Sequence, residues 1–306
     1  METAATQLSD EVKDLNLEPY VLELEADGLT VVPPEITGVS AGLFDRCTDV
    51  LLTQFTAMTG GCPISLAAGP EGELSWPERT ASPLAPKDAP PPTQMLIQQL
   101  LQLDRCFRDL FVNPAVDALI DHLVGRAPIL GAKMRRLSST NSFVKWQGEY
   151  GYGPNLGLHC DQGANPLPWG SRALTANATW CLTEYTLEDG ALAYVPGSHR
   201  SNAHPGPGAA KAAKPVVCPR GSVIVWPGST WHGAYPKQTP GLRLNAVAYY
   251  RHQAVLPQEN MKVTMRDEPW DDCDNPAMMR ELIGFDDIFP YEAQNQPVPT
   301  LASAAA

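Results

Sequence analysis

The chain of 306 residues lacks an excess of basic charge. It has 22 lysines and arginines against 34 aspartates and glutamates, a formal charge of −12 with neutral histidines. Binding to nucleic acid needs a basic surface that displaces counterions from phosphates. The densest basic cluster, Lys133, Arg135 and Arg136, is too small for that role. The sequence therefore predicts no nucleic-acid partner.

Long apolar segments are also lacking. No run reaches the roughly 18 apolar residues that would indicate a membrane-spanning helix, so we expect no membrane partner. Residues 1–14 carry four acidic side chains and no apolar segment of the kind that a secretory signal contains. These features predict a cytoplasmic protein, and they give no indication of its oligomeric state.

Cysteines are few, odd in number and scattered, and no C-x-x-C pair occurs among them. A disulfide framework or a thiolate metal cage would need paired or closely spaced cysteines. We therefore expect reduced thiols, as in a cytoplasmic protein. The seven positions are Cys47, Cys62, Cys106, Cys160, Cys181, Cys218 and Cys273.

Turn-forming residues are abundant instead, with 24 glycines and 30 prolines. Each proline inside a helix would cost about 3 kcal/mol, which disfavours an all-helical bundle. Hydrophobic residues make up 43% of the chain and charged residues 18%, which is typical of a folded globular protein. This composition favours short strands joined by many turns.

The N-terminal part shows helical spacing. Apolar residues recur every three or four positions in 41–58, and a helical pattern returns in 94–111. Asn113 followed by proline predicts the start of a further helix, which Gly125 ends. A short strand is expected at 29–32. We predict a helical N-terminal layer over residues 20–130.

A proline-rich insertion interrupts this layer at residues 62–93. It has eight prolines between Pro63 and Pro92. Loops of this length are uncommon inside compact domains and are functional or disordered when they occur. Two interpretations stay open: a solvated surface insertion, or a lid over a substrate pocket.

From about residue 131 the pattern changes to short β-branched and aromatic runs between Gly/Pro turns, which is typical of a sandwich or barrel. The expected strands are 142–146, 174–182, 191–195, 222–226 and 242–250. We predict a mainly β fold with flanking helices in one domain, 1–306. Its β core would span 131–255, and 256–306 would hold a helix at 275–283 and a tail.

Two histidines and one aspartate are the strongest candidates for chemistry. His159 and Asp161 are two residues apart, so in an extended chain they point to the same side. His232 follows the expected strand 222–226. Two imidazoles and one carboxylate form the facial triad that binds iron(II) and leaves positions open for a co-substrate and dioxygen. The H-x-D pair alone is weak evidence for an iron site, since metallophosphoesterases also contain it.

Arg243 lies eleven residues after His232, on the expected strand 242–250. Alternation puts Arg243, Asn245, Val247 and Tyr249 on one face. An unpaired guanidinium inside a barrel is costly, so an inward Arg243 would need an anion such as the far carboxylate of a dicarboxylic keto acid. An outward Arg243 in a surface ion pair is the alternative.

Several short motifs now occur in a fixed order, and together they resemble the phytanoyl-CoA dioxygenase family of iron(II)- and 2-oxoglutarate-dependent oxygenases. They lie densely between residues 146 and 250. The motifs are Leu158-His159-Cys160-Asp161, Trp180-Cys181-Leu182, Glu188-Asp189-Gly190-Ala191-Leu192, Val195-Pro196-Gly197-Ser198-His199, Gly221-Ser222-Val223-Ile224-Val225, Trp231-His232-Gly233 and Gly241-Leu242-Arg243.

The resemblance implies a double-stranded β-helix, a cupin-like jelly roll with the metal site between two sheets. By it, His159, Asp161 and His232 would bind Fe(II), with 2-oxoglutarate and O2 as co-substrates. Arg243 would hold the distal carboxylate of 2-oxoglutarate. Trp180 matches a position that lines the co-substrate, although a structural tryptophan in the core is an equal alternative.

The sequence departs from the family pattern two residues after His232. A small hydroxyl residue often stands there and helps to bind the co-substrate, whereas this chain has Ala234. Thr230, Asn245 or Gln147 could supply the missing hydrogen bond, and the sequence does not choose among them.

The expected function is hydroxylation, desaturation or cyclisation of a small, partly apolar metabolite, with release of succinate and CO2. Relatives that halogenate have a small residue at the position of Asp161, so halogenation is not expected. An acyl-CoA substrate is the alternative within the family, but the acidic composition disfavours it. Outside the family, a zinc hydrolase or a non-enzymatic jelly-roll binding protein stays open.

Overall fold

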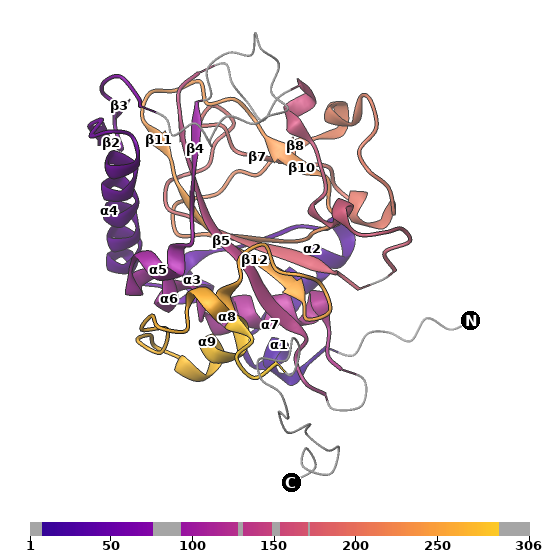
Figure 1. Cartoon of the computed structure of the whole chain (residues 1–306). Helices are drawn as coiled ribbons and strands as arrows, with labels where there is room; N and C mark the ends of the chain where they lie inside the picture. The colour runs from indigo at the N-terminus through magenta and orange to yellow at the C-terminus, as the bar shows by residue number, and fades with distance from the viewer. Residues whose placement is uncertain (1–7, 76–92, 128–130, 149–153, 171, 288–306) are drawn as a thin grey trace.

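The computed structural model describes residues 8–75, 93–127, 131–148, 154–170 and 172–287, and a jelly roll of two facing antiparallel sheets forms its centre (Figure 1). The large sheet has the order β1-β9-β6-β12-β5-β11, with β4 also paired to β5. Its strands are β1 (Thr30–Val32), β4 (Gln94–Gln98), β5 (Arg135–Trp146), β6 (Thr175–Cys181), β9 (Val223–Pro227), β11 (Leu242–Arg243) and β12 (Asn245–His252). The small sheet, in the order β10-β7-β8, contains β7 (Leu192–Tyr194), β8 (Lys214–Pro215) and β10 (His232–Ala234). A hairpin joins β2 (Ile64–Ser65) to β3 (Gly69–Pro70).

Helices cover the face of the large sheet that points away from the small sheet (Figure 1). Among them, α7 contacts β5, β6, β9 and β12, and α9 contacts β5. The α-helices are α1 (Asp10–Asp14), α2 (Glu18–Asp27), α3 (Pro34–Thr37), α4 (Ala41–Met58), α5 (Leu100–Leu103), α6 (Arg105–Phe111), α7 (Pro114–Val124), α8 (Met261–Thr264) and α9 (Pro276–Ile283). In the described residues, no helix has the length and apolar character needed to cross a membrane.

Local sequence signals explain the two long N-terminal helices. Ser40 caps α4 by accepting a hydrogen bond from the Leu43 amide, and α4 has the predicted bounds. The Asn113 side chain accepts hydrogen bonds from two amides at the start of α7, and Gly125 ends that helix at φ 88°. Both predictions of these helices are confirmed.

The helix predicted over 94–111 is wrong in its first part. Residues 94–98 form β4, which pairs with β5 in a register that joins Met95 to Val144. Met95 and Ile97 are buried while Leu96 is exposed, which is the two-residue period of a strand. Pairing with the edge of β5 therefore outweighs the local helical pattern, and helix begins only at Leu100.

The large sheet has two chemically different faces. On β6, Ala176, Ala178 and Trp180 belong to the hydrophobic core against the helices. Asn177 and Thr179 point to the opposite side, into a pocket between the sheets. Strand β12 repeats the pattern, with Ala246, Ala248 and Tyr250 in the core and Asn245, Val247 and Tyr249 in the pocket. Alternation along each strand thus separates the stabilising face from the face that can bind ligands.

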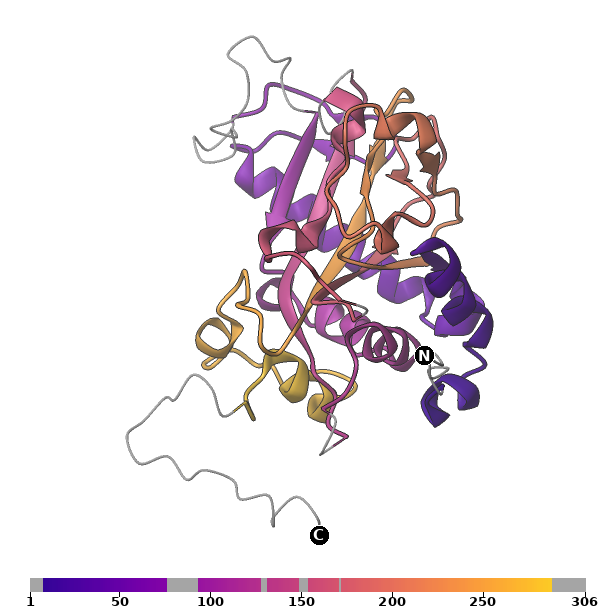
Figure 2. The same cartoon turned by 90° about the vertical axis from the view of Figure 1, so that its right-hand side faces the viewer.

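The basic cluster of Lys133, Arg135 and Arg136, at the start of β5, forms ion pairs within the fold. Asp117 of α7 accepts hydrogen bonds from Lys133 at 2.7 Å and from Arg135 at 2.6 Å. Arg135 also pairs with Glu281 of α9, and Arg136 pairs with Asp287 at 2.7 Å. These ion pairs hold the C-terminal helices, yellow in Figure 2, beside β5.

Much of the proline-rich insertion, residues 76–92, lies outside the described residues, as does the predicted tail from 288 onward. The surface insertion and the lid therefore both stay predictions.

Candidate active site

His159 and His232 lie side by side between the two sheets. Their backbones exchange two hydrogen bonds of 2.9 Å, and their ring centroids are 4.4 Å apart. His232 begins β10, and Gly233 follows it. A Cβ on Gly233 would lie 2.2 Å from the carbonyl oxygen of Leu156, so only glycine allows the segment before His159 to approach β10 this closely. The pairing of these two segments brings together residues that are far apart in the sequence.

Asp161 completes the group from the first position of a short 3-10 helix, Asp161–Ala164. Its Oδ1 lies 3.4 Å from His159 Nε2 and its Oδ2 lies 3.5 Å from His232 Nε2. One side-chain atom from each of the three residues lies within 4.8 Å of the others. Asn177 of β6 donates a hydrogen bond to Asp161 Oδ2 at 2.6 Å, which fixes the carboxylate from the large sheet.

Both imidazoles present the same nitrogen to the carboxylate. His159 Nδ1 lies 2.9 Å from the carbonyl oxygen of Gly157, and His232 Nδ1 lies 3.0 Å from that of Thr230. A carbonyl oxygen can only accept a hydrogen bond, so each Nδ1 carries the proton. Each Nε2 then keeps a lone pair, as a histidine that binds a metal requires.

The charges in this group favour a carboxylate next to a neutral imidazole. Burial alone would raise the pKa of Asp161, but the nearby His232 and His159 and the hydrogen bond from Asn177 lower it below its usual range. Burial lowers the pKa of His232, although the Asp161 carboxylate opposes that shift. Burial opposes protonation of His159, but the Asp161 carboxylate outweighs it and raises the pKa of His159, so a metal ion there would displace a proton from its Nε2. Two deprotonated Nε2 atoms and one anionic oxygen are donors that suit a divalent transition metal.

A pocket of about 250 Å³ opens from these three residues into the space between the sheets. Side chains from β4, β5, β6 and β12 line it on the large-sheet side, and Leu192, His232 and Ala234 line it on the small-sheet side. The ring of Trp226 lies 5.1 Å from the ring of His232 and forms part of the wall. The metal-ligand candidates therefore face a cavity and not solid core.

Arg243 enters this pocket from β11 and is 3% exposed. Its Nη1 donates a hydrogen bond to the carbonyl oxygen of Gly190 at 2.9 Å, and its Cζ lies 5.0 Å from the Tyr185 ring centroid. Its Nε is buried without a hydrogen-bond partner, and no carboxylate in the described part of the chain pairs with it. Since a buried unpaired cation is costly, this end of the pocket fits an anionic ligand.

Tyr185 is a pocket residue that the sequence reasoning missed. Its hydroxyl accepts a hydrogen bond from Asn245 Nδ2 at 3.0 Å, and Asn245 Oδ1 accepts one from the Phe143 amide at 2.8 Å. Burial raises the pKa of Tyr185, so its proton stays on the oxygen. The hydroxyl can donate that proton to a ligand beside Arg243. Tyr185 lies in the loop after β6, where the sequence has no strand or helix periodicity that could predict which way a side chain points.

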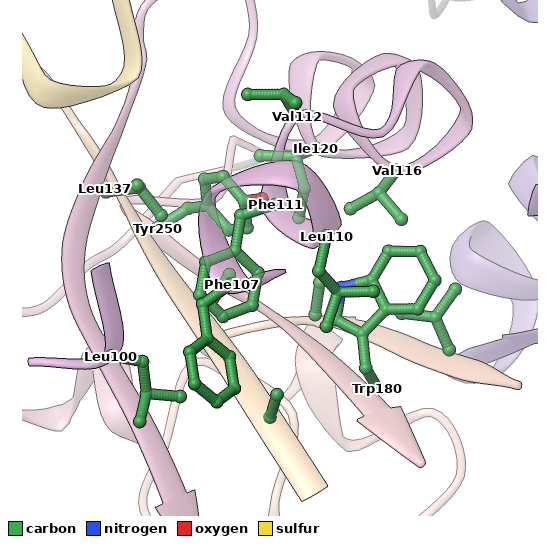
Figure 3. Close-up of a cluster of buried hydrophobic side chains, with 14 of the residues drawn as sticks. Leu100, Phe107, Leu110, Phe111, Val112, Val116, Ile120, Leu137, Trp180 and Tyr250 are labelled. Carbon is green, nitrogen blue, oxygen red and sulfur yellow. The ribbon is translucent and has the colours of Figure 1, made fainter. Parts of the chain in front are cut away.

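Trp180 does not line the pocket, contrary to the resemblance. It is fully buried on the helix-facing side of β6, and its ring centroid lies 6.1 Å from that of Phe44. Figure 3 shows Trp180 in the same cluster as Leu110 and Val116. Side chains alternate between the two faces of β6, so Asn177 and Thr179 point into the pocket and Trp180 points into the core. The alternative interpretation, a structural tryptophan in the core, is therefore the correct one.

Gln147 also lies away from the pocket. It follows the last residue of β5, is exposed, and donates a hydrogen bond to the carbonyl oxygen of Gln238 at 2.7 Å. Thr230 is buried and donates to the Gly28 carbonyl oxygen at 2.6 Å. Of the three suggested replacements for the missing hydroxyl residue, only Asn245 lines the pocket, and Ala234 lines it too.

The end of the pocket nearest β4 is uncharged. Leu96 and Gln98 line it from β4, Asn141 from β5, and Gln258 from the segment after β12. Ser139 donates a hydrogen bond to Gln258 Oε1 at 2.6 Å, and Asn141 Oδ1 is buried without a partner. Neutral amides and an aliphatic side chain therefore stand opposite the cationic end at Arg243.

A jelly roll with two imidazoles and one carboxylate gathered between its sheets is the architecture of non-haem iron oxygenases with a two-histidine, one-carboxylate site. The chain belongs to the phytanoyl-CoA dioxygenase (PhyH) family, whose model matches residues 92–245.

Two fungal relatives share parts of the sequence. Dioxygenase af480 from Aspergillus fumigatus is 26% identical over 183 residues, which cover 58% of this chain and 55% of the relative. Dioxygenase andF from Emericella variicolor is 33% identical over 88 residues, which cover 28% of this chain and 30% of the relative. The matches thus span about half or less of these relatives.

Solved structures share the fold at low sequence identity. HygX from Streptomyces hygroscopicus, solved with nickel and 2-oxoglutarate bound, has a TM-score of 0.55 and 16% identity over 78% of this chain and 88% of its own. SnoN, a non-heme alpha ketoglutarate dependent epimerase from nogalamycin biosynthesis, has a TM-score of 0.53 and 20% identity over 84% and 90%. These likenesses establish the jelly-roll fold.

Proposed function

We propose that the protein is an iron(II)- and 2-oxoglutarate-dependent oxygenase whose metal ligands are His159, Asp161 and His232. The observation that carries this proposal is the convergence of two Nε2 atoms and one carboxylate within 4.8 Å, with both Nδ1 protons held by carbonyl oxygens. Membership of the family and the names of the fungal relatives support it. When bound, iron(II) would supply the activation of dioxygen and the oxidative decarboxylation of the keto acid.

Arg243 is the proposed partner of the distal carboxylate of 2-oxoglutarate. Its guanidinium is buried and lacks a carboxylate partner in the described residues, and it lies over the ring of Tyr185. Tyr185, whose hydroxyl can donate a hydrogen bond, lines the same pocket. A carboxylate at this position would satisfy both donors. The keto end would then point toward the three ligands, because all of these side chains line the same pocket. Among relatives of this fold, HygX binds 2-oxoglutarate.

The substrate is proposed to be a small, uncharged and partly apolar metabolite. Leu96 and the amides of Gln98, Asn141 and Gln258 line the end of the pocket away from Arg243. Such amides recognise hydroxyl or carbonyl groups. Arg243 is the one cation among the described lining residues, so this wall offers nothing for the phosphates of an acyl-CoA. The net reaction would convert substrate, 2-oxoglutarate and O2 to hydroxylated product, succinate and CO2. For desaturation or cyclisation, the products would be the desaturated or cyclised compound, succinate, CO2 and water.

A reducing, cytoplasmic location is part of the same proposal. All seven cysteines are buried free thiols, and Cys181 and Cys218 are unlinked although their sulfur atoms lie 3.6 Å apart. Iron(II) also needs a reducing environment to stay in that oxidation state.

The test is to incubate the iron-loaded protein with 2-oxoglutarate, oxygen and fractions of a metabolite extract. Succinate release should accompany the gain of one oxygen atom, or the loss of two hydrogen atoms, by a metabolite. Asp161→Ala should give neither signal, whereas the exposed Gln147→Ala variant should match the wild type. Hydrolysis of a substrate with bound zinc, without succinate in any fraction, would favour the hydrolase alternative.

A further inference from the structure

A second buried cation, Lys145, lies next to Arg243. The interior face of β5 carries Asn141 and Phe143, which line the pocket, and alternation puts Lys145 on that same face. The antiparallel register pairs Lys145 directly with Arg243, and side chains that are opposite in this way start about 5 Å apart. Lys145 is 1% exposed.

The charges around Lys145 are positive or already paired. Its Nζ donates a hydrogen bond to the carbonyl oxygen of Tyr235, and in the described residues no carboxylate pairs with it. The nearby Lys237 is held by Asp189 Oδ1 at 2.8 Å and by Thr239 Oγ1 at 2.7 Å, so Asp189 is occupied. Burial, followed by the charges of Arg243 and Lys237, lowers the pKa of Lys145 to about 6.

The loop at Gly190 keeps these groups together. Gly190 has φ 74°, and a Cβ there would lie 2.9 Å from the Tyr235 carbonyl oxygen and 3.2 Å from Lys145 Cε. The Gly190 carbonyl accepts the hydrogen bond from Arg243. The two cations therefore lie in one polar environment of backbone carbonyls, and of the two only Arg243 lines the pocket.

We propose that Lys145 is a proton-linked positioning residue of the dicarboxylate site, which takes up one proton from solvent when a dicarboxylate binds at Arg243. The inference rests on the proposed function, because the anion is the distal carboxylate of 2-oxoglutarate. Two adjacent positive charges in a buried site repel each other, and an anion between the sheets removes that repulsion. Neutral Lys145 in the free protein thus becomes an ammonium in the complex.

The sign of the pH dependence follows from this exchange. Above about pH 6 Lys145 is neutral in the free protein and protonated in the complex, so binding consumes a proton. The affinity for 2-oxoglutarate should then fall by up to about tenfold for each pH unit above 6, until Lys145 also loses its proton in the complex. Below pH 6 the affinity should become independent of pH. The other nearby groups do not follow this course: Arg243 stays charged, Tyr185 stays neutral, and Lys237 and Asp189 stay paired.

The experiment is calorimetric titration of 2-oxoglutarate into the nickel-loaded full chain at pH 7.5, in two buffers with different ionisation enthalpies. The difference between the buffers gives the number of protons taken up. The wild type should take up close to one proton. Lys145→Met, which is neutral, and Lys145→Arg, which is always charged, should both take up none. The exposed Lys214→Met variant is the matched control and should behave as the wild type.

A monocarboxylic keto acid separates the two ends of the co-substrate. 2-Oxobutyrate lacks the distal carboxylate, so its binding should take up no proton in any variant. Equal proton uptake by the wild type, Lys145→Met and Lys145→Arg would overturn the inference. Tight binding of 2-oxoglutarate that depends on Arg243 but takes up no proton would overturn it too, and would leave the proposed function in place. No binding of 2-oxoglutarate to the wild type would contradict the proposed function itself.

Discussion

The two faces of the large sheet carry opposite chemistry on the same strands. The face toward the helices is built from alanine, valine and aromatic side chains, with Trp180 fully buried among them. The face toward the small sheet carries Asn177, Thr179 and Asn245 and encloses a pocket. One face provides the apolar burial that stabilises the fold. The other face forms the functional site, and its buried polar groups contribute less to stability. Substitutions on the two faces should therefore have different consequences.

The largest effect is expected on the pocket side, at Asp161. Asp161→Ala removes the one carboxylate among the three candidate ligands and should abolish both iron binding and succinate release. The protein should stay folded, because this side chain is not part of the hydrophobic core. Metal content by mass spectrometry and the thermal unfolding temperature test the two parts of this prediction. Retention of stoichiometric iron by the variant would refute the ligand assignment.

On the helix side, Trp180→Ala should mainly change stability. Removing a large buried side chain leaves a cavity and costs about 3–5 kcal/mol of unfolding free energy. Urea denaturation measures this loss, with Trp180→Phe as the milder control. At low temperature the folded variant should bind 2-oxoglutarate as the wild type does. Weaker binding with unchanged stability would instead support a contact between Trp180 and the co-substrate.

Returning to the pocket side, Arg243→Met should weaken the binding of 2-oxoglutarate. Losing one partner of a buried charged pair costs about 2–5 kcal/mol, so Kd should rise about 30-fold or more. Calorimetry on the nickel-loaded protein gives this value, and 2-oxobutyrate serves as the control ligand. A similar loss for both keto acids would show that Arg243 does not contact the distal carboxylate.

A smaller effect is expected at Asn177, which supports a ligand from the pocket side of β6. Its hydrogen bond of 2.6 Å orients the Asp161 carboxylate. Groups in this position contribute about 10–100-fold to metal affinity, so Asn177→Ala should release metal at lower chelator concentrations than the wild type. A change of less than about twofold in metal affinity would contradict the orienting role.

The smallest effect is expected outside both faces. Gln147 is exposed and contacts the backbone of Gln238. Gln147→Ala should leave iron content, affinity for 2-oxoglutarate and thermal stability unchanged. A clear rise in the Kd for 2-oxoglutarate would show that Gln147 reaches the co-substrate after all.

Several features of the fold were predictable because they depend on local sequence. The bounds of α4 and α7 follow from helical spacing and from the caps at Ser40 and Asn113. The alternation that groups Arg243 with Asn245, Val247 and Tyr249 follows from the geometry of a strand, and all four side chains line the pocket. The strand β4 was not predictable in this way, because its conformation depends on pairing with β5.

The sequence by itself determined the family motifs, their order and which residues share a face of each strand. Only the tertiary structure decided which face of β6 meets the helices and which meets the pocket, because a two-residue period is the same for both. It also decided that Lys145 lies buried beside Arg243, since a register between β5 and β11, nearly 100 residues apart, brings them together. Local patterns fix the direction of a side chain relative to its own strand, whereas its neighbours depend on long-range pairing.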